Sequence, residues 1–117
     1  MRPGDTVRSA ITVLELYQQP ILPIIGEDDG LIGVLTAHSI AVALTGHQGA
    51  MAVGSDAPCA KIMVAPDLVA ASDEPVRATI DRWLDAQSPG VVVVDAGRVV
   101  GLIGPAEICL ALLEDDS

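Results

Sequence analysis

The chain has 117 residues, and sixteen acidic against six basic residues give it a formal charge of −10 at pH 7. A field of this sign repels phosphate backbones, so nucleic-acid binding is not expected. No apolar run approaches the roughly 20 residues that span a bilayer and the first residues do not form a signal peptide, so we expect a cytoplasmic protein without membrane association.

The core is expected to be aliphatic. Half of the residues are apolar, but the only aromatic side chains are Tyr17 and Trp83, and the length suits one compact domain. The two cysteines and two histidines show neither a disulfide framework nor zinc-ligand spacing, so no metal site is expected. Val, Ile, Leu and Ala therefore build the core, with Trp83 inside it.

The first part of the chain predicts a helix, a hairpin and a second helix. Asp5 or Thr6 caps a helix that carries Val7, Ile11 and Leu14 on one side. Two short apolar runs flank an acidic turn ending in Gly30, which is typical of a β-hairpin. The expected segments are a helix from residue 7, strands at 21–25 and 31–35, and a helix at 37–44.

The second part predicts the same order with one strand more. A Gly-rich, polar stretch after residue 44 indicates a surface connection. The next helix begins after Ser72-Asp73-Glu74-Pro75 and carries Val76, Ile80, Trp83 and Leu84 on its buried side. The expected segments are a strand at 68–71, this helix, strands at 91–94 and 99–103, and a helix at 105–113.

These two parts are copies of each other. Residues 7–44 recur as residues 76–112, and a one-residue slip falls in the hairpin turns, where insertions disturb no packing. The duplication predicts two pseudo-equivalent halves, with any site at the seam between them. The matches at an offset of 69 are Val7, Arg8, Ile11, Gln18 and Pro20 with Val76, Arg77, Ile80, Gln87 and Pro89. Those at an offset of 68 are Gly33, Ile40, Ala43 and Leu44 with Gly101, Ile108, Ala111 and Leu112.

The ordered motifs of both copies resemble the cystathionine β-synthase (CBS) domain. The second copy has Lys61-Ile62-Met63, then Ser72 to Val76, then Gly97-Arg98-Val99-Val100-Gly101-Leu102-Ile103; the first has Gly4-Asp5-Thr6-Val7 and Gly30 to Thr36. Together they cover nearly the whole chain and resemble a CBS pair, or Bateman module. The resemblance implies an α/β (α+β) fold of tandem β-α-β-β-α units about a pseudo-twofold axis, with the first leading strand missing or truncated.

The resemblance also sets the expected domains and function. Residues 1–46 are expected to form the first CBS repeat, 47–58 a linker and 59–117 the second repeat. Such pairs are regulatory, usually dimeric, and bind adenosine-containing ligands such as AMP, ADP, ATP or S-adenosylmethionine between the repeats. No cofactor is required, and the sequence has no P-loop, nucleophile elbow or other catalytic motif, so we expect no enzyme.

In this family a carboxylate that accepts from the ribose hydroxyls follows a Thr or Ser by three residues. The first copy has Thr36 but places Ser39 at the carboxylate position, while the second has Gly104 and Glu107. A hydrogen bond to a charged group contributes about 1.5–3 kcal/mol, which is roughly 10- to 150-fold in affinity. Any adenosine-containing ligand is therefore expected to bind weakly.

The resemblance implies two candidate clefts, of which the first is favoured because its leading segment is complete. The first cleft would consist of Thr36, His38, Ser39, Met63, Val64, Leu68, Pro89, Gly90 and Val91. The second would consist of Pro20, Ile21, Leu22 and Glu107.

Other interpretations of these residues stay open. Thr36 is also a suitable helix cap, and Glu107 suits the first turn of any helix because it complements the helix dipole. The chain can therefore be a ligand-free structural or dimerisation module, or the detached regulatory part of a transporter or enzyme. The helix at 37–44 is apolar on more sides than a small domain covers, so a homodimer is expected in each case.

Overall fold

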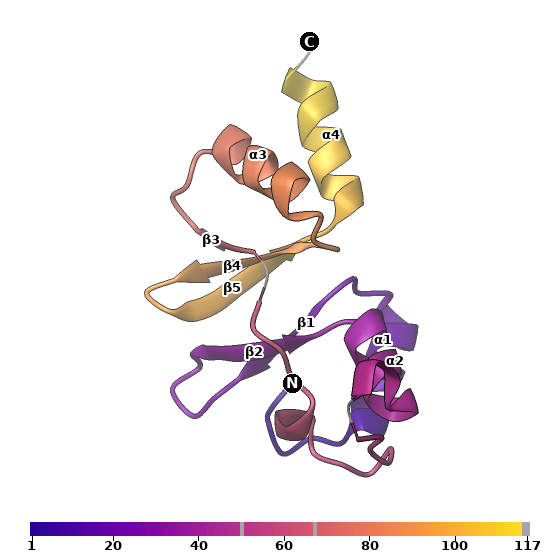
Figure 1. Cartoon of the computed structure of the whole chain (residues 1–117). Helices are drawn as coiled ribbons and strands as arrows, with labels where there is room; N and C mark the ends of the chain where they lie inside the picture. Colours follow the sequence, from indigo (N-terminus) through magenta and orange to yellow (C-terminus); the bar gives the residue numbers. More distant parts are fainter. Residues whose placement is uncertain (50, 67, 116–117) are drawn as a thin grey trace.

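A computed structural model describes residues 1–49, 51–66 and 68–115. Two small sheets face each other across the middle of the molecule, and each carries its two helices on the outer side (Figure 1). In chain order the elements are α1 (Val7–Tyr17), β1 (Leu22–Ile25), β2 (Leu31–Leu35), α2 (Ala37–Thr45), η1 (His47–Gly49), η2 (Cys59–Lys61), β3 (Val69–Ala71), α3 (Val76–Ala86), β4 (Val91–Asp95), β5 (Arg98–Ile103) and α4 (Pro105–Asp115). Residues 50, 67, 116 and 117, which fall in the predicted connection, leading segment and C-terminal end, lie outside the described residues.

The predicted order of elements is confirmed. We call α1 to α2 the first repeat and β3 to α4 the second repeat. The two hairpins share an irregularity as well as a topology, since β1 and β2 shift register between Ile24 and Ile25, and β4 and β5 between Val93 and Val94. Position 93 is 24 plus 69, so the duplication extends to the bulge. None of the described helices is long and apolar enough to cross a membrane.

The leading strand differs between the repeats, as expected. In the second repeat β3 pairs in parallel with β4, where Ala70 lies opposite Val93. The counterpart of Ala70 is Met1, since 1 plus 69 is 70. Met1 forms no strand, but its carbonyl accepts a hydrogen bond from Ile25 N at 2.8 Å. The first repeat thus keeps one backbone hydrogen bond at the place of the leading strand, and its described residues form no strand there.

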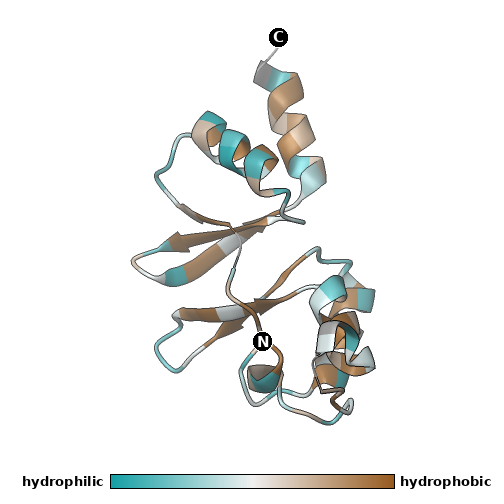
Figure 2. Ribbon diagram, in the orientation of Figure 1, coloured by the Kyte–Doolittle hydropathy of each residue, from teal (hydrophilic) through white to brown (hydrophobic). Residues whose placement is uncertain are grey.

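A separate apolar cluster joins the repeats. Ile21, Val34 and Val92 are buried at the seam, and Figure 2 shows the facing strands as largely hydrophobic. The hairpin turns also meet, since Leu31 N donates to Gly97 O at 3.3 Å. Because this cluster contains residues of both repeats, each sheet needs the other to bury its inner apolar side chains.

Burial follows the prediction only in part. The residues expected to be buried in the core are Ile24, Ile25, Val34, Val93, Val94, Leu102 and Trp83. Ile24 and Val34 are buried, while the other five are only half-buried. Trp83 packs beside the core of the second repeat, and its indole Nε1 has no hydrogen-bond partner among the described residues. On the helix faces predicted to be buried, the exposed fractions are 38% for Ile11, 64% for Val76 and 58% for Leu84. Periodicity identifies the apolar side of a helix but not whether another element covers it.

Candidate functional site

A cavity of about 500 Å³ opens where β2 passes into α2. Thr36, His38 and Ser39 line it from the start of α2, and Met63 and Val64 line it from the segment that leads to the second repeat. The structure therefore brings together five of the residues predicted for the first cleft. We call this cavity the Thr36 cavity.

Thr36 and Ser39 hold the start of α2 through a reciprocal capping box. Thr36 Oγ1 accepts from Ser39 N at 3.0 Å, and Ser39 Oγ accepts from Thr36 N at 2.8 Å. Ser39 Oγ also lies 3.0 Å from Thr36 O, to which it donates its own proton. Among the described residues, no acceptor takes the Thr36 hydroxyl proton, which leaves it able to donate into the cavity.

The wall formed by Met63 and Val64 is held by backbone pairing with β2. Val34 N donates to Val64 O at 2.9 Å, and Val64 N donates to Val34 O at 3.0 Å. The absence of a side chain at Gly33 permits this approach, because a Cβ there would lie 2.8 Å from Met63 Sδ. A glycine inside an apolar strand is a recognisable signal of such an approach.

The charge of the Thr36 cavity differs from that of the whole chain. Its lining includes Lys61 and His38 and, among the residues that the structure describes, no carboxylate, although the chain has a formal charge of −10. The remaining walls are mostly aliphatic. A cavity of this kind suits an anionic group next to an apolar one.

The other residues predicted for the first cleft lie elsewhere. Leu68 and Val91 are buried in the core of the second repeat, and neither lines the Thr36 cavity. Gly90 lies against the other repeat, where an added Cβ would lie 3.3 Å from both Pro20 Cγ and Ile21 Cγ2. Pro89 is exposed. These residues support the walls between the repeats and do not extend the cavity.

The second predicted cleft is smaller. A hollow of about 280 Å³ is lined by Pro20 and Glu107, while Leu22 is buried in the first repeat and Ile21 lines the Thr36 cavity. Glu107 Oε2 accepts a hydrogen bond from Gly104 N at 3.2 Å, so this carboxylate caps its own helix. Its place in the helix corresponds to that of Ser39, since 39 plus 68 is 107.

Part of the cavity lining was not predicted from the sequence. Met51 and Val53 come from the connection after α2, and Val42 and Ala43 come from the second turn of that helix. In the sequence, Met51 and Val53 stand out only as apolar residues within a Gly-rich stretch. Because this stretch is not part of the duplication, comparing the two repeats does not identify them as site residues. The connection is thus a wall of the site as well as a link.

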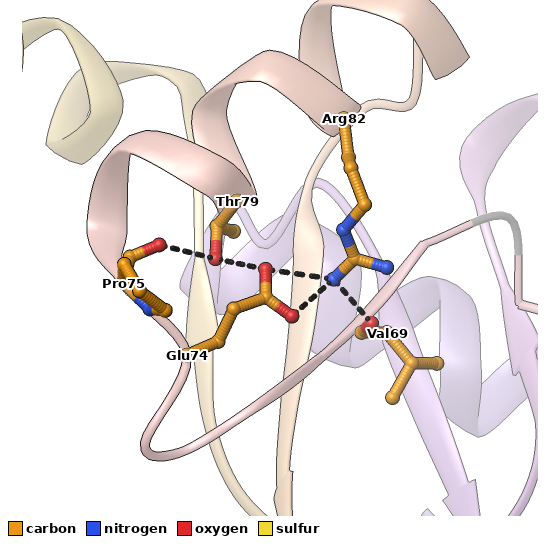
Figure 3. A network of polar contacts seen from close by, with 5 residues as sticks. All are labelled: Val69, Glu74, Pro75, Thr79 and Arg82. Carbon is orange, nitrogen blue, oxygen red and sulfur yellow. Dashed lines mark hydrogen bonds and ion pairs between the residues drawn. The ribbon is translucent and has the colours of Figure 1, made fainter.

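A polar network stands apart from both cavities, in the second repeat (Figure 3). Arg82 donates to both carboxylate oxygens of Glu74, at 2.7 and 2.9 Å, and to Val69 O at 2.9 Å. The Thr79 hydroxyl also donates to Glu74. The hydrogen bonds from Thr79 and then Arg82 lower the pKa of the Glu74 carboxyl.

The described residues contain no metal-binding cluster. No group of three or more His, Cys, Asp and Glu side chains comes together in the described part of the chain. Both cysteines are free, and burial, followed by the nearby charge of Asp5, raises the pKa of the Cys59 thiol. Neither cysteine has the setting of an activated nucleophile.

Comparison with known proteins gives matches at the level of structure. No family model matches the chain, and no curated protein matches it. Among solved structures, CBSX2 in complex with AMP has a TM-score of 0.82 at 20% identity, covering 100% of this chain and 88% of CBSX2. A putative acetoin utilization protein from Vibrio cholerae also has a TM-score of 0.82, at 18% identity, covering 100% and 87%. A CBS domain pair/ACT domain protein from Thermotoga maritima has a TM-score of 0.78, at 18% identity, covering 100% and 89%.

Proposed function

We propose that this chain, which has the fold of a CBS domain pair, is a regulatory module that binds an adenosine-containing ligand weakly in the Thr36 cavity. The repeats are proposed to be residues 1–46 and 59–117, with 47–58 as the linker. The observation that carries the proposal is that the described lining of this cavity contains Lys61 and no carboxylate, in a chain with a formal charge of −10. The AMP in the CBSX2 structure supports the class of ligand.

The side chains of the cavity define how such a ligand would be held. The Thr36 hydroxyl can donate to a phosphate or ribose oxygen, and Lys61 can approach a phosphate as a point charge. The base would lie among the aliphatic side chains, next to Met63 and Val64. With one lysine at the cavity, a nucleoside or monophosphate should bind better than a triphosphate, whose charge has little compensation.

Ser39 explains why the proposed binding is weak. Its hydroxyl is neutral, and it already donates to Thr36 O and accepts from Thr36 N. It therefore cannot act as the charged acceptor of two ribose hydroxyls. We expect dissociation constants from about tens of micromolar to millimolar, since losing a charged acceptor costs roughly 10- to 150-fold.

Calorimetry with adenosine, AMP, ADP, ATP and S-adenosylmethionine tests this function. In the Ser39→Asp variant we expect AMP affinity to rise about tenfold or more, because a carboxylate becomes available to the ribose. The matched control is Glu107→Gln at the pseudo-equivalent position, which should leave the affinity unchanged. If no compound binds either the parent chain or Ser39→Asp, the nucleotide proposal is wrong.

A homodimer is part of the proposal. The groove between α1 and α2, about 420 Å³, is mostly apolar and is lined by Ile11, Leu14, Glu15, Ala37, Ile40, Ala41 and Leu44. A second copy would cover this surface, which supports self-association. The proposed place of this association is the cytoplasm. Light scattering at micromolar concentration should give twice the monomer mass, and the monomer mass would contradict the proposal.

The runner-up is a ligand-free module whose role is dimerisation or structural support. It is favoured by one observation, namely that Ser39 and Glu107 both accept hydrogen bonds from the backbone at the start of their own helices. Either module can also be the detached regulatory part of a transporter or enzyme. The calorimetric series above separates the two classes, since a ligand-free module binds none of the compounds.

A further inference from the structure

The connection between the repeats forms one wall of the Thr36 cavity. The described residues that line the cavity come from three parts of the chain, namely the first repeat, residues 61–64 and the connection. The connection contributes Met51 and Val53. Figure 1 shows it leaving the end of α2 and passing along the first repeat. We call residues 51–54 the strap.

The wall of residues 61–64 is held firmly on both sides. Before it, the backbone of residues 55–60 bonds to residues 3–8, and after it Val64 pairs with Val34. Cys59 and Ile62 are buried in the core cluster of the first repeat. The bonds before it are Arg8 N to Ser55 O at 2.9 Å, Val7 N to Ala57 O at 2.9 Å, Cys59 N to Asp5 O at 2.7 Å and Ala60 N to Pro3 O at 3.0 Å. This wall therefore moves only if core contacts break.

The strap is held to the first repeat by far less. Among the described residues, one backbone hydrogen bond ties it there, from Val53 N to Ala43 O at 3.0 Å. At Gly54 the surroundings are open, since an added Cβ would meet no atom within 4 Å. A segment with one exposed backbone bond and few packing contacts has a low local stability. We therefore expect the strap to open without any change in the core of the first repeat.

Met51 lines the Thr36 cavity but packs on little. Its exposed fraction is 89%, whereas Met63, which lines the same cavity, is half-buried against the core of the first repeat. A ligand in the cavity would offer the Met51 side chain an apolar surface. Methionine is flexible enough to fit an irregular shape, and the burial of its apolar area favours movement onto the ligand.

We propose that the strap closes over the ligand of the Thr36 cavity, with Met51 as the side chain that covers it. This inference rests on the proposed function and adds how the same site is regulated. Because the other walls are fixed by core packing, the change that the ligand causes lies in the connection between the repeats. Ligand binding thus converts a loosely held connection into an ordered one, which a partner protein or an attached domain would sense.

Methyl NMR of the whole chain tests the closure, with AMP as the probe. The chain has three methionines, which are Met1, Met51 and Met63. Without ligand we expect the Met51 methyl to relax as that of an unrestrained side chain. Saturating AMP should shift its signal and reduce its mobility. The Met63 methyl should shift without a change in mobility, and the Met1 methyl, which does not line the cavity, should stay unchanged.

Calorimetry with two variants measures what Met51 contributes to binding. Met51→Ala should weaken AMP binding by about three- to tenfold, because apolar area that is buried only in the complex is lost. Met51→Leu retains that area and should stay within about twofold of the parent chain. Neither substitution should change the melting temperature without ligand, since the side chain is exposed in the free chain.

The matched control is Leu16→Ala. Leu16 is also an exposed apolar side chain, with an exposed fraction of 70%, but it does not line the cavity, so its truncation should leave AMP affinity unchanged. Hydrogen exchange gives a second measure. AMP should slow the exchange of the Val53 amide in the parent chain, and should slow it less in Met51→Ala.

The possible failures distinguish this inference from the proposed function. If AMP binds while the Met51 methyl stays as mobile as in the free chain, the strap does not close, and only this inference is wrong. Equal AMP affinities of the parent chain and Met51→Ala lead to the same conclusion. A Met51 methyl that is immobile without ligand would show a permanently closed strap and would also overturn it. If none of the adenosine-containing compounds binds, the proposed function and the closure are both wrong.

Discussion

The two repeats share a fold but hold their first helices in different ways. In the first repeat the backbone of residues 55–60 holds the start of α1. In the second repeat the side chains of Glu74, Thr79 and Arg82 tie the start of α3 to β3 (Figure 3). The counterparts of these three residues are Asp5, Ala10 and Val13, which cannot form the same network. Duplication therefore preserved the topology while the stabilising contacts diverged.

The second helix of each repeat, α2 or α4, also begins with different hydrogen bonds. At the start of α2 the hydroxyl oxygens of Thr36 and Ser39 each accept a hydrogen bond from the other residue's backbone N–H, whereas at the start of α4 only the Glu107 carboxylate accepts one, from Gly104 N. Both solutions satisfy the backbone N–H at the beginning of the helix. Only the first keeps a hydroxyl proton for another acceptor. The comparison shows why the Thr36 side of the molecule is the better candidate for a ligand.

The largest effect is expected from truncating the valine that begins each first helix. Val7→Ala should destabilise the chain by about 2–3 kcal/mol, because Val7 is fully buried in one cluster with Cys59 and Ile62. Val76→Ala should change stability by less than about 0.5 kcal/mol, because Val76 is exposed. Urea unfolding of both variants measures the difference. Equal effects would show that the second repeat is covered in solution.

A smaller effect is expected from the paired glycines of β2 and β5. Gly33→Ala should cost about 1–3 kcal/mol, because the new Cβ would overlap Met63. At the corresponding Gly101 an added Cβ meets no atom within 4 Å, so Gly101→Ala should be neutral or stabilise by about 0.4–1 kcal/mol. Thermal unfolding compares the two. If Gly33→Ala were as stable as the parent chain, the contact between Met63 and β2 would be wrong.

The smallest effect is a pH dependence that belongs to the second repeat. The pKa of Glu74 is lowered in the folded chain by Thr79 and Arg82, so its contribution to stability is fully present above the ordinary value near 4.5. That contribution is lost as the pH falls through the lowered pKa. The melting temperatures of the parent chain and Glu74→Gln should therefore differ at pH 7, and the difference should shrink as the pH falls below the ordinary carboxyl value. A difference that stays constant as the pH is lowered until the parent chain unfolds would contradict the assignment.

The sequence was sufficient to predict the order of elements, because periodicity and turns were present twice. The predicted strand at 31–35 matches β2, and the predicted helix at 37–44 ends one residue before α2 does. The role of residues 55–60 was not predictable in the same way. Their regular hydrogen bonds with residues 3–8 join backbone groups, and such bonds leave no pattern of side-chain types in a sequence. Because the packing of residues 55–60 on the first repeat was not predicted, the different burial of Val7 and its counterpart Val76 was not predicted either.

The sequence predicted some residues of the candidate site correctly, but it placed others wrongly or missed them. Thr36 and Ser39 have the spacing of a capping box, so their proximity follows from local structure alone. Leu68 and Val91 belong to the adjacent core of the second repeat rather than to the cavity, because their side chains pack with Ile80 and Ile108 of the helices α3 and α4. Met51 and Val53 reach the cavity only through the path of the connection, which no local rule determines.

The single tryptophan has a spectroscopic consequence. Trp83 is the only indole in the chain and packs beside the core of the second repeat, while the only phenol, Tyr17, is exposed on the first. Indole fluorescence therefore reports the unfolding of one repeat, whereas far-ultraviolet circular dichroism reports the helices of both. Because Ile21, Val34 and Val92 form one cluster across the seam, the two signals should change at the same denaturant concentration, as in a two-state transition.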